Sequence, residues 1–233
     1  MMIVMPANNC SRDVYWLAGR YHRRVAWLLN AYNPRQAPWH RMNYAIDNGA
    51  YSTYLSGDPW DGDRFLDGCD RIYAHGQRPL WCAVPDVVCD AAQTLKMWEE
   101  WKRILRNRYP NWPLAFVAQD GMGLADLPNT AEVIFIGGST LWKRSVLREW
   151  PHVLPRVHVG RINSWEWLLA CHDAGVESID GTGWIRHPER LCDLERYLQI
   201  TTDGTSRDEQ LQLFKSDLSP ALVAREKEVD HDY

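Results

Sequence analysis

The chain lacks the long apolar run that a membrane-spanning helix requires. No stretch of about 18 consecutive apolar residues occurs in its 233 residues. The N-terminus, MMIVMPANNC, has no basic segment ahead of its short apolar patch, so we interpret it as a first β-strand and not as a signal peptide. We therefore predict no membrane association and a cytoplasmic location.

Paired metal-binding or disulfide-forming cysteines are also missing. The six cysteines contain no CxxC or CxC pair, which argues against a tetrahedral zinc site and against a disulfide scaffold. We predict free thiols, no metal ion and no cofactor. No GxGxxG or GxxxxGK[ST] motif follows a predicted strand, which disfavours dinucleotide-binding and P-loop proteins.

Positive charge is not in excess, and lysine is scarce. The net charge is −4 and the isoelectric point about 6.1, so the whole chain is not a basic nucleic-acid binder. Residues 203–233 carry the entire negative excess. Only five of the 26 basic residues are lysine, and six arginines lie between Arg12 and Arg41. Arginine suits bidentate contact with phosphate, although a solvated helix face explains this cluster equally well.

Short β-rich runs alternate with amphipathic stretches. The predicted strands are Ile3–Met5, Tyr44–Asp47, Leu80–Val84, Leu114–Ala118, Val133–Ile136, Val157–Val159 and Ser178–Asp180, with an eighth near Leu198–Thr202. The predicted helices are Val14–Leu29, Arg64–His75, Ala91–Arg108, Leu141–Glu149, Ser164–Ala174 and Pro188–Leu198. This alternation predicts an α/β protein, a minimal or somewhat irregular (β/α)₈ TIM-like barrel over residues 1–202, followed by a C-terminal extension, 203–233, with an acidic end.

Polar residues and glycines follow the predicted strands where a barrel carries its active site. They are Asp47, Asp86, Gln119, Asp120, Gly137, Gly138, Gly160, Arg161 and Asp180. For Asp120, and for Asp90 at the start of a predicted helix, a turn or helix N-cap is the favoured interpretation. Paired carboxylates suit cleavage of a glycosidic bond by double displacement. Asp and Gln together match the amide edge of a purine, and adjacent glycines let the backbone approach a flat ligand.

These strand-end motifs resemble those of the tRNA-guanine transglycosylases, and more closely the short phage and bacterial DpdA-type relatives that place 7-deazaguanines in DNA. The resemblance spans roughly Tyr44 to Arg190. DNGAYS at 47–52 is similar to the family's DSGGFQ motif, FVAQDG at 116–121 to its VQGG segment, and IGGST at 136–140 to its GGLA segment. The stretch from VHVGRINSWEWLL to ESIDGTGWIR resembles the strand, helix and strand that lead into FDCVxPTR.

The resemblance implies a role for each matched residue. Asp180 would attack C1′ of the sugar, and Asp47 would be the general acid and base for the leaving and entering bases. Asp86 would bind the purine N–H groups, Gln119 and the backbone of Gly138 its carbonyl, and Gly137 and Tyr51 would complete the base site. We predict that phosphates contact the following basic residues: Arg161, Arg186, Arg23, Arg24 and Lys143.

Departures from the family pattern shift the expected substrate from tRNA towards DNA. The chain has Ala50, Tyr51 and Ser52 where the family has Gly, Phe and Gln, and Gly-Thr-Gly follows Asp180. The zinc subdomain and the long C-terminal part that docks tRNA are absent. The predicted activity is therefore exchange of guanine in DNA for a 7-deazaguanine base, in the host cytoplasm if a phage encodes the chain.

Three alternatives remain open at the level of sequence. They are a tRNA-guanine transglycosylase that docks RNA without zinc, a barrel glycosidase acting on sugars, and a catalytically inactive barrel that binds a base. A partner protein that supplies DNA affinity is also compatible with the neutral charge of residues 1–202. Most of the 13 tryptophans should be core residues, with Trp60 and Trp184 the candidates for stacking on a base.

Overall fold

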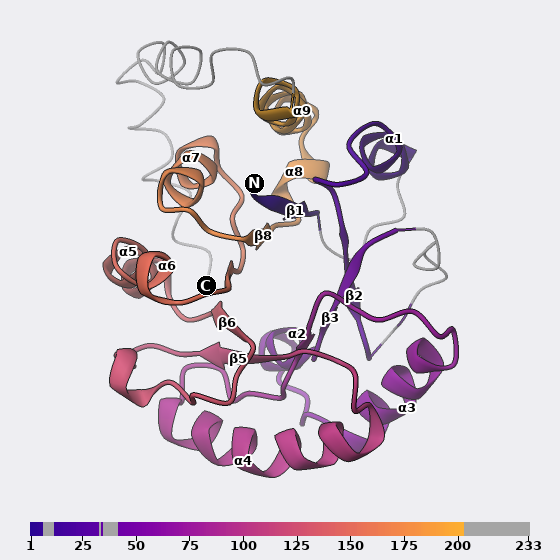
Figure 1. The fold of residues 1–233 in the computed structure, drawn as a ribbon, viewed down its shortest axis with the longest axis vertical. Helices are drawn as coiled ribbons and strands as arrows, with labels where there is room; N and C mark the ends of the chain where they lie inside the picture. The colour runs from indigo at the N-terminus through magenta and orange to yellow at the C-terminus, as the bar shows by residue number, and fades with distance from the viewer. Residues whose placement is uncertain (7–11, 33, 35–41, 203–233) are drawn as a thin grey trace.

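The fold is a nearly closed barrel of parallel strands surrounded by helices (Figure 1). The computed structural model describes residues 1–6, 12–32, 34 and 42–202. The eight strands are β1 (Ile3–Met5), β2 (Trp27–Asn30), β3 (Tyr44–Asp47), β4 (Cys82–Ala83), β5 (Leu114–Ala118), β6 (Val133–Ile136), β7 (Val157–Val159) and β8 (Ser178–Asp180). The predicted (β/α)₈ architecture is thus confirmed, whereas the predicted extension 203–233 lies outside the described residues.

Helices follow the strands and cover the outside of the barrel (Figure 1). They are α1 (Arg12–Arg20), α2 (Ala50–Ser56), α3 (Gly62–Tyr73), α4 (Ala91–Arg108), α5 (Thr140–Leu147), α6 (Trp150–Val153), α7 (Trp165–Asp173), α8 (Gly183–Arg186) and α9 (Pro188–Thr202), with a 3₁₀ turn at Leu124–Asp126. Ser164 caps α7, because its side chain accepts a hydrogen bond from the amide of Trp167.

Neighbouring strands pair in parallel in the order β1-β8-β7-β6-β5-β4-β3-β2. The two end strands meet at a parallel bridge between Val4 and Val25. There the amide of Val4 donates to the carbonyl of Arg24 at 2.8 Å, and the amide of Ala26 donates to Val4 at 3.0 Å. Because every strand runs the same way, all the carboxyl ends lie on one rim of the barrel.

Two predicted elements were placed wrongly. Residues 27–29 were predicted as the end of a helix but belong to β2, and Leu198–Thr202 was predicted as a strand but is the last part of α9. Strand β2 is buried on both faces, so its apolar run has no period that distinguishes it from a buried helix. The β-branched residues near 200 resemble a strand, but the hydroxyl of Thr201 bonds the carbonyl of Tyr197 and thereby fits a helix.

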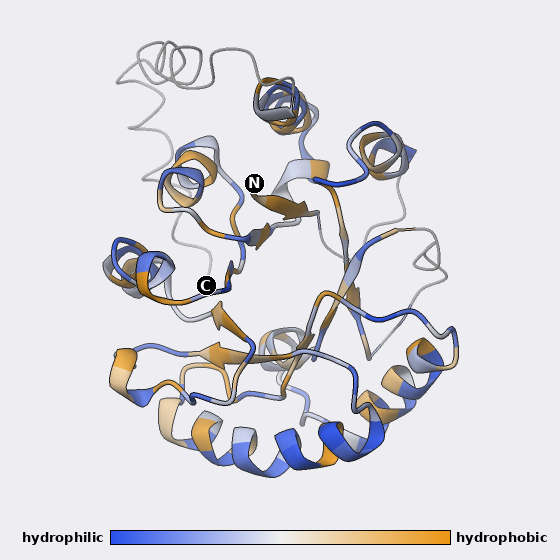
Figure 2. Cartoon of the chain, in the orientation of Figure 1, coloured by the Kyte–Doolittle hydropathy of each residue, from blue (hydrophilic) through white to orange (hydrophobic). Residues whose placement is uncertain are grey.

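The apolar core has two layers. The larger layer lies between the strands and the helices, whose outward faces are hydrophilic, as Figure 2 shows for α4. The smaller layer fills the barrel interior and combines small alanines from several strands with one large ring, Trp81. Most tryptophans are core residues, as predicted. Trp184 is fully buried, which removes it as a candidate for stacking on a base, while half-buried Trp60 stays a candidate.

No helix in the described part of the chain is long and apolar enough to cross a membrane. Within the same residues, no group of three or more His, Cys, Asp or Glu side chains is arranged to hold a metal ion. Cys69, Cys82, Cys89, Cys171 and Cys192 are free thiols.

Two helical glycines provide a matched test of this packing. A methyl group on Gly68 in α3 would overlap the backbone carbonyl of Ala31, whereas one on Gly19 in α1 meets nothing within 4 Å. We expect Gly68→Ala to lower the free energy of unfolding by more than about 2 kcal/mol, because backbone must move. Gly19→Ala should raise it by roughly 0.5–1 kcal/mol. Urea unfolding of both variants measures the two changes, and equal effects would contradict the close approach of α3 to β2.

Candidate active site

Three carboxylates meet at the rim formed by the carboxyl ends of the strands. Asp47 is the last residue of β3, Asp180 the last of β8, and Asp86 follows β4. The charges of both Asp180 and Asp86 contribute to raising the pKa of Asp47, so the three lie near one another. Parallel strands that share one rim explain how residues 133 positions apart in the chain come together.

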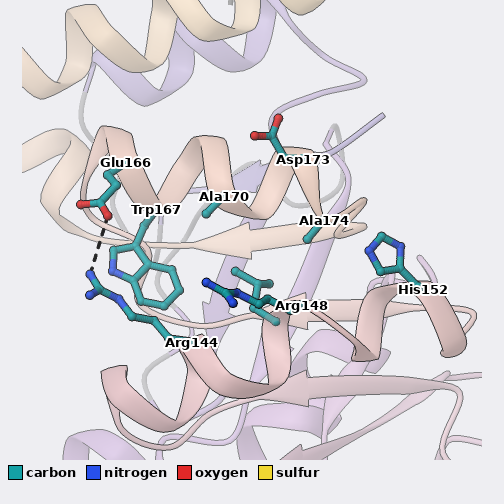
Figure 3. Close-up of a pocket in the computed structure, with 9 residues that line it drawn as sticks. Arg144, Arg148, His152, Glu166, Trp167, Ala170, Asp173 and Ala174 are labelled. Carbon is teal, nitrogen blue, oxygen red and sulfur yellow. Dashed lines mark ion pairs between the residues drawn. The ribbon is translucent and has the colours of Figure 1, made fainter. Parts of the chain in front are cut away.

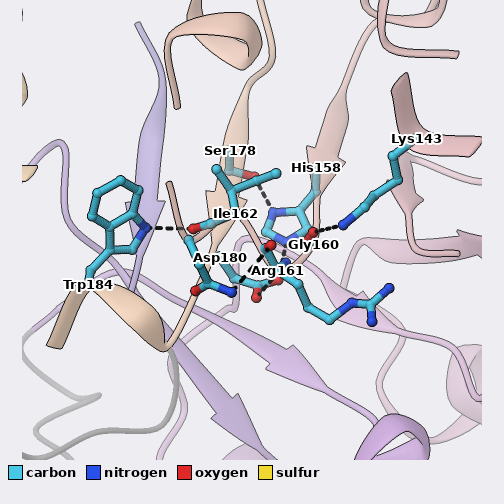
Figure 4. Close-up of polar contacts among 9 residues, drawn as sticks. Lys143, His158, Gly160, Arg161, Ile162, Ser178, Asp180 and Trp184 are labelled. Atoms are coloured by element: carbon cyan, nitrogen blue, oxygen red, sulfur yellow. Dashed lines mark hydrogen bonds and ion pairs between the residues drawn. The ribbon is translucent and has the colours of Figure 1, made fainter. Parts of the chain in front are cut away.

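Asp180 is held by hydrogen bonds on both carboxylate oxygens (Figure 4). The backbone amide of Arg161 donates to Oδ1 at 3.1 Å, and Nε2 of His158 lies 3.1 Å from Oδ2. The side chain is nearly buried, at 11% exposure, yet it has no ion pair with lysine or arginine among the described residues. The arrangement fixes the carboxylate in one orientation without neutralising its charge.

Glycines surround Asp180 because backbone approaches it closely from two sides. A methyl group on Gly181 would overlap the carbonyl oxygen of Ile162, and one on Gly183 would lie 2.9 Å from the side chain of Asn163. On the other side, a methyl group on Gly160 would lie 3.3 Å from Oδ2 of Asp180. The glycines therefore serve the close packing of the β7–α7 loop against β8 and its following turn.

Burial, and to a smaller extent the neighbouring charges of Asp180 and Asp86, raise the pKa of Asp47 to about 7. The backbone amides of Gly49 and Asn48 donate to this carboxylate and oppose the shift. Although protein surrounds Asp47, the residue keeps partial exposure to solvent. A carboxyl group with these properties can both give and take a proton near neutral pH.

Asp86 belongs to a buried amide network. Asn48 donates from Nδ2 to Oδ1 of Asp86 at 2.8 Å, and Gln119 donates from Nε2 to Oδ2 at 2.7 Å. Burial raises the pKa of Asp86 to about 6, while the bond from Asn48 lowers it. The carbonyl oxygen of Gln119 accepts from the amide of Cys89 at 3.1 Å, so this side chain is fixed from both ends.

The predicted base site gathers around Arg161. Its guanidinium donates to the carbonyl of Gly138 and lies 4.5 Å from the ring centroid of Tyr51. Arg161 has a φ of 59°, an uncommon conformation for a residue with a side chain, and its backbone amide donates to Asp180. Gly137 donates its amide to Ala118, and a methyl group on Gly137 would lie 3.4 Å from Nε2 of Gln119.

Two of the predicted phosphate contacts, Arg24 and Lys143, are wrong because both side chains are buried, whereas the contact of exposed Arg23 stays a prediction. Arg24 is buried and donates to the carbonyl of Met2 at 2.8 Å, where it helps close the barrel. Lys143 is buried and donates to the carbonyl of Gly160 at 2.8 Å, as Figure 4 shows. Arg23 is exposed but precedes β2, which places it at the opposite rim from the carboxylates. Arg186, in α8 directly after β8, is exposed on the carboxylate side.

Asp120 and Asp90 are structural, as the sequence favours. Asp120 accepts hydrogen bonds from the amide and the hydroxyl of Ser139, which connects the ends of β5 and β6. Asp90 accepts from the amide of Gln93 at 2.9 Å and caps α4.

Sequence reasoning missed Asn48, His158 and Ser178. A signal existed for the last two, because side chains alternate along a strand. His158 and Gly160 are two residues apart, as are Ser178 and Asp180, and His158 pairs with Ser178 in the register of β7 and β8. Alternation therefore places both on the face of Asp180.

A groove of about 490 Å³ lies elsewhere, between α5–α6 and α7 on the outside of the barrel (Figure 3). Its lining mixes basic Arg144 and Arg148 with acidic Glu166 and Asp173, and Arg144 lies 3.9 Å from Glu166. None of the three strand-end carboxylates lines it, so we assign the chemistry to the strand ends and not to this groove.

Comparisons of the chain with protein-family models and with curated proteins found no match. The transglycosylase resemblance therefore stays a prediction.

The raised pKa of Asp47 predicts a pH-dependent stability. The folded state holds a proton on Asp47 up to about pH 7, whereas an unfolded aspartate loses it near 3.8, so ionisation costs stability progressively between these values. Asp47→Asn removes this cost, and we expect its unfolding free energy to exceed that of wild type at pH 8, by at most about 4 kcal/mol.

The two proteins should differ far less at pH 4.5, because wild-type Asp47 is then protonated in the folded state. Denaturant unfolding at both pH values measures the difference, with Asp67→Asn, at an exposed position of α3, as the matched control. A gain for Asp47→Asn of the same size at both pH values would show that the folded protein does not hold this proton.

Proposed function

We propose that the protein is a base-exchange transglycosylase that replaces guanine in DNA by a 7-deazaguanine derivative through a covalent bond between Asp180 and the sugar. The observation that carries the proposal is the meeting of Asp180 and Asp47 at one rim of the barrel, with Asp180 oriented on both oxygens. No metal or redox cofactor takes part in the proposed reaction.

The two carboxyl groups suit different tasks. In the first step an Asp180 oxygen bonds to C1′ as the C1′–N9 bond breaks, and protonated Asp47 gives its proton to the departing guanine. In the second step the entering base loses its N9 proton to Asp47 and bonds to C1′, and Asp180 departs. A pKa of about 7 lets Asp47 take both roles in the same pH range.

Recognition of the base rests on the network around Asp86. The exocyclic amine and ring N–H of a guanine need acceptors, and its carbonyl needs donors. Asp86 is already oriented by Asn48 and Gln119, so its remaining lone pairs have a fixed direction. The second N–H of the Gln119 amide and the backbone of Gly138 are the donors proposed for the carbonyl.

The choice of a polynucleotide over a free nucleoside rests on the exposed cations on the carboxylate side, Arg161 and Arg186. Reaching C1′ within DNA requires that the target nucleotide leaves the base stack, and phosphate contacts on either side would hold it in that position. The choice of DNA over tRNA rests on the sequence departures alone.

Exchange of labelled guanine tests the proposal. Wild type, Asp180→Asn and Asp47→Asn are incubated separately with duplex DNA, single-stranded DNA and tRNA, and label in the polynucleotide is counted. We expect label in DNA with wild type only, and at least 10⁴-fold less with Asp180→Asn, because an amide is a far weaker nucleophile and leaving group than a carboxylate.

Label entering tRNA in place of DNA would keep the chemistry and overturn the substrate. Hydrolysis of sugar substrates without a polynucleotide would instead make the protein a glycosidase. Binding of guanine with no exchange into any polynucleotide would show that the protein is a base-binding barrel without catalytic activity.

Arg186 and Arg23 form a matched pair for the polynucleotide contact, because both are exposed arginines but at opposite rims. We expect Arg186→Ala to weaken DNA binding and to reduce the slope of log K against log salt by about 1. Arg23→Ala should change neither quantity. Fluorescence titrations between 50 and 200 mM salt measure both quantities. Equal slopes for Arg186→Ala and wild type would show that Arg186 does not contact a phosphate.

A further inference from the structure

His158 connects a buried serine to Asp180. Its Nδ1 lies 2.8 Å from the hydroxyl of Ser178, and its Nε2 lies 3.1 Å from Oδ2 of Asp180 (Figure 4). The imidazole has no exposed surface, and Ser178 is equally buried. Both ring nitrogens are therefore used inside the protein, and one of them reaches the carboxylate that the proposed reaction needs.

Aromatic packing holds the imidazole in place. The ring centroid of Trp81 lies 4.6 Å from that of His158, and the centroid of Phe135 lies 4.5 Å from it. The two aromatic rings also contact each other, with centroids 5.6 Å apart. A ring enclosed in this way keeps one orientation, so its hydrogen bonds point in constant directions.

The partners of His158 determine where its proton lies. An ionised Asp180 can only accept hydrogen bonds, so Nε2 must carry the hydrogen that points to it. In a neutral imidazole Nδ1 is then an acceptor, and the hydroxyl of Ser178 can supply the matching donor. The carboxylate of Asp180 thus selects the tautomer, and the hydroxyl of Ser178 satisfies Nδ1 in that tautomer.

We propose that Ser178 and His158 are positioning residues which orient Asp180 and stabilise its charge as it leaves the sugar. This inference rests on the proposed function. In the second step the C1′–O bond breaks and its electron pair returns to Asp180. A donor aimed at Oδ2 stabilises the returning charge more than it stabilises the ester, so it accelerates this step more than the first.

Kinetics of the covalent adduct test the proposal in the full-length protein with the polynucleotide that supports exchange. His158→Phe keeps an aromatic ring between Trp81 and Phe135 but loses the donor. We expect it to slow breakdown of the adduct roughly 10²-fold, so that the adduct accumulates, while formation changes far less. His158→Gln restores an N–H donor at similar reach and should recover most of the rate. The rate of Ser178→Ala should fall between those of the two His158 variants, because Nδ1 of His158 then loses its buried hydrogen-bond partner.

The rates of the two steps distinguish positioning from packing. Equal loss of formation and breakdown in both His158 variants, or no change in His158→Phe, would overturn the proposal. A role in packing alone would alter stability and leave the ratio of the two steps unchanged.

Nitrogen NMR on histidine-labelled protein gives a readout that needs no activity. The signal absent from His158→Phe identifies His158, and we expect the Nε2–H tautomer in wild type. The Nδ1–H tautomer would overturn the proposal even in an active enzyme. If wild type exchanges no base into any polynucleotide, the proposed function fails, while the Nε2–H tautomer would still support the role of His158 in orienting Asp180.

Discussion

Closure of a parallel barrel is the constraint on which the other features depend. The strands contribute as few as two residues each, and β1 meets β2 only at the bridge between Val4 and Val25. Every strand nevertheless directs its carboxyl end to the same rim. Residues that are separated by most of the chain, such as Asp47 and Asp180, become neighbours for this reason alone.

The rim gathers three carboxylates, and no lysine or arginine of the described residues forms an ion pair with them. Burial and mutual repulsion instead keep a proton on Asp47, while the backbone amide of Arg161 and the imidazole of His158 hold Asp180. Amides from the side chains of Asn48 and Gln119 hold Asp86. Neutral donors orient the carboxylates and leave their reactivity available, which is the property that a nucleophile and a proton-transfer group require.

Much of this arrangement could be predicted because it follows from local patterns. Alternating strand and helix signals indicate the barrel, and Asp47 and Asp180 each sit directly between an apolar strand and a glycine-containing turn. The predictions that were wrong concern buried residues, and the identity of a single residue does not reveal whether it is buried. Strand β2 is apolar without periodicity, and Arg24 and Lys143 look like surface cations although each bonds a buried backbone carbonyl.

His158 is a functional candidate that the sequence patterns did not reveal. A histidine between two valines has no distinctive motif, and its importance emerges only when the pairing of β7 with β8 places it opposite Ser178. The alternation of side chains was available in the sequence, but the register of the two strands was not.

A covalent bond between Asp180 and a nucleotide is the feature that separates the proposed mechanism from the alternative uses of this rim. Wild-type protein is incubated with DNA and no entering base, quenched in acid and digested, and the peptide containing Asp180 is analysed by mass spectrometry. The mechanism predicts a nucleotide adduct on Asp180 that disappears when 7-deazaguanine is added before the quench. Base exchange that proceeds with the adduct on another residue, or with none, would contradict it.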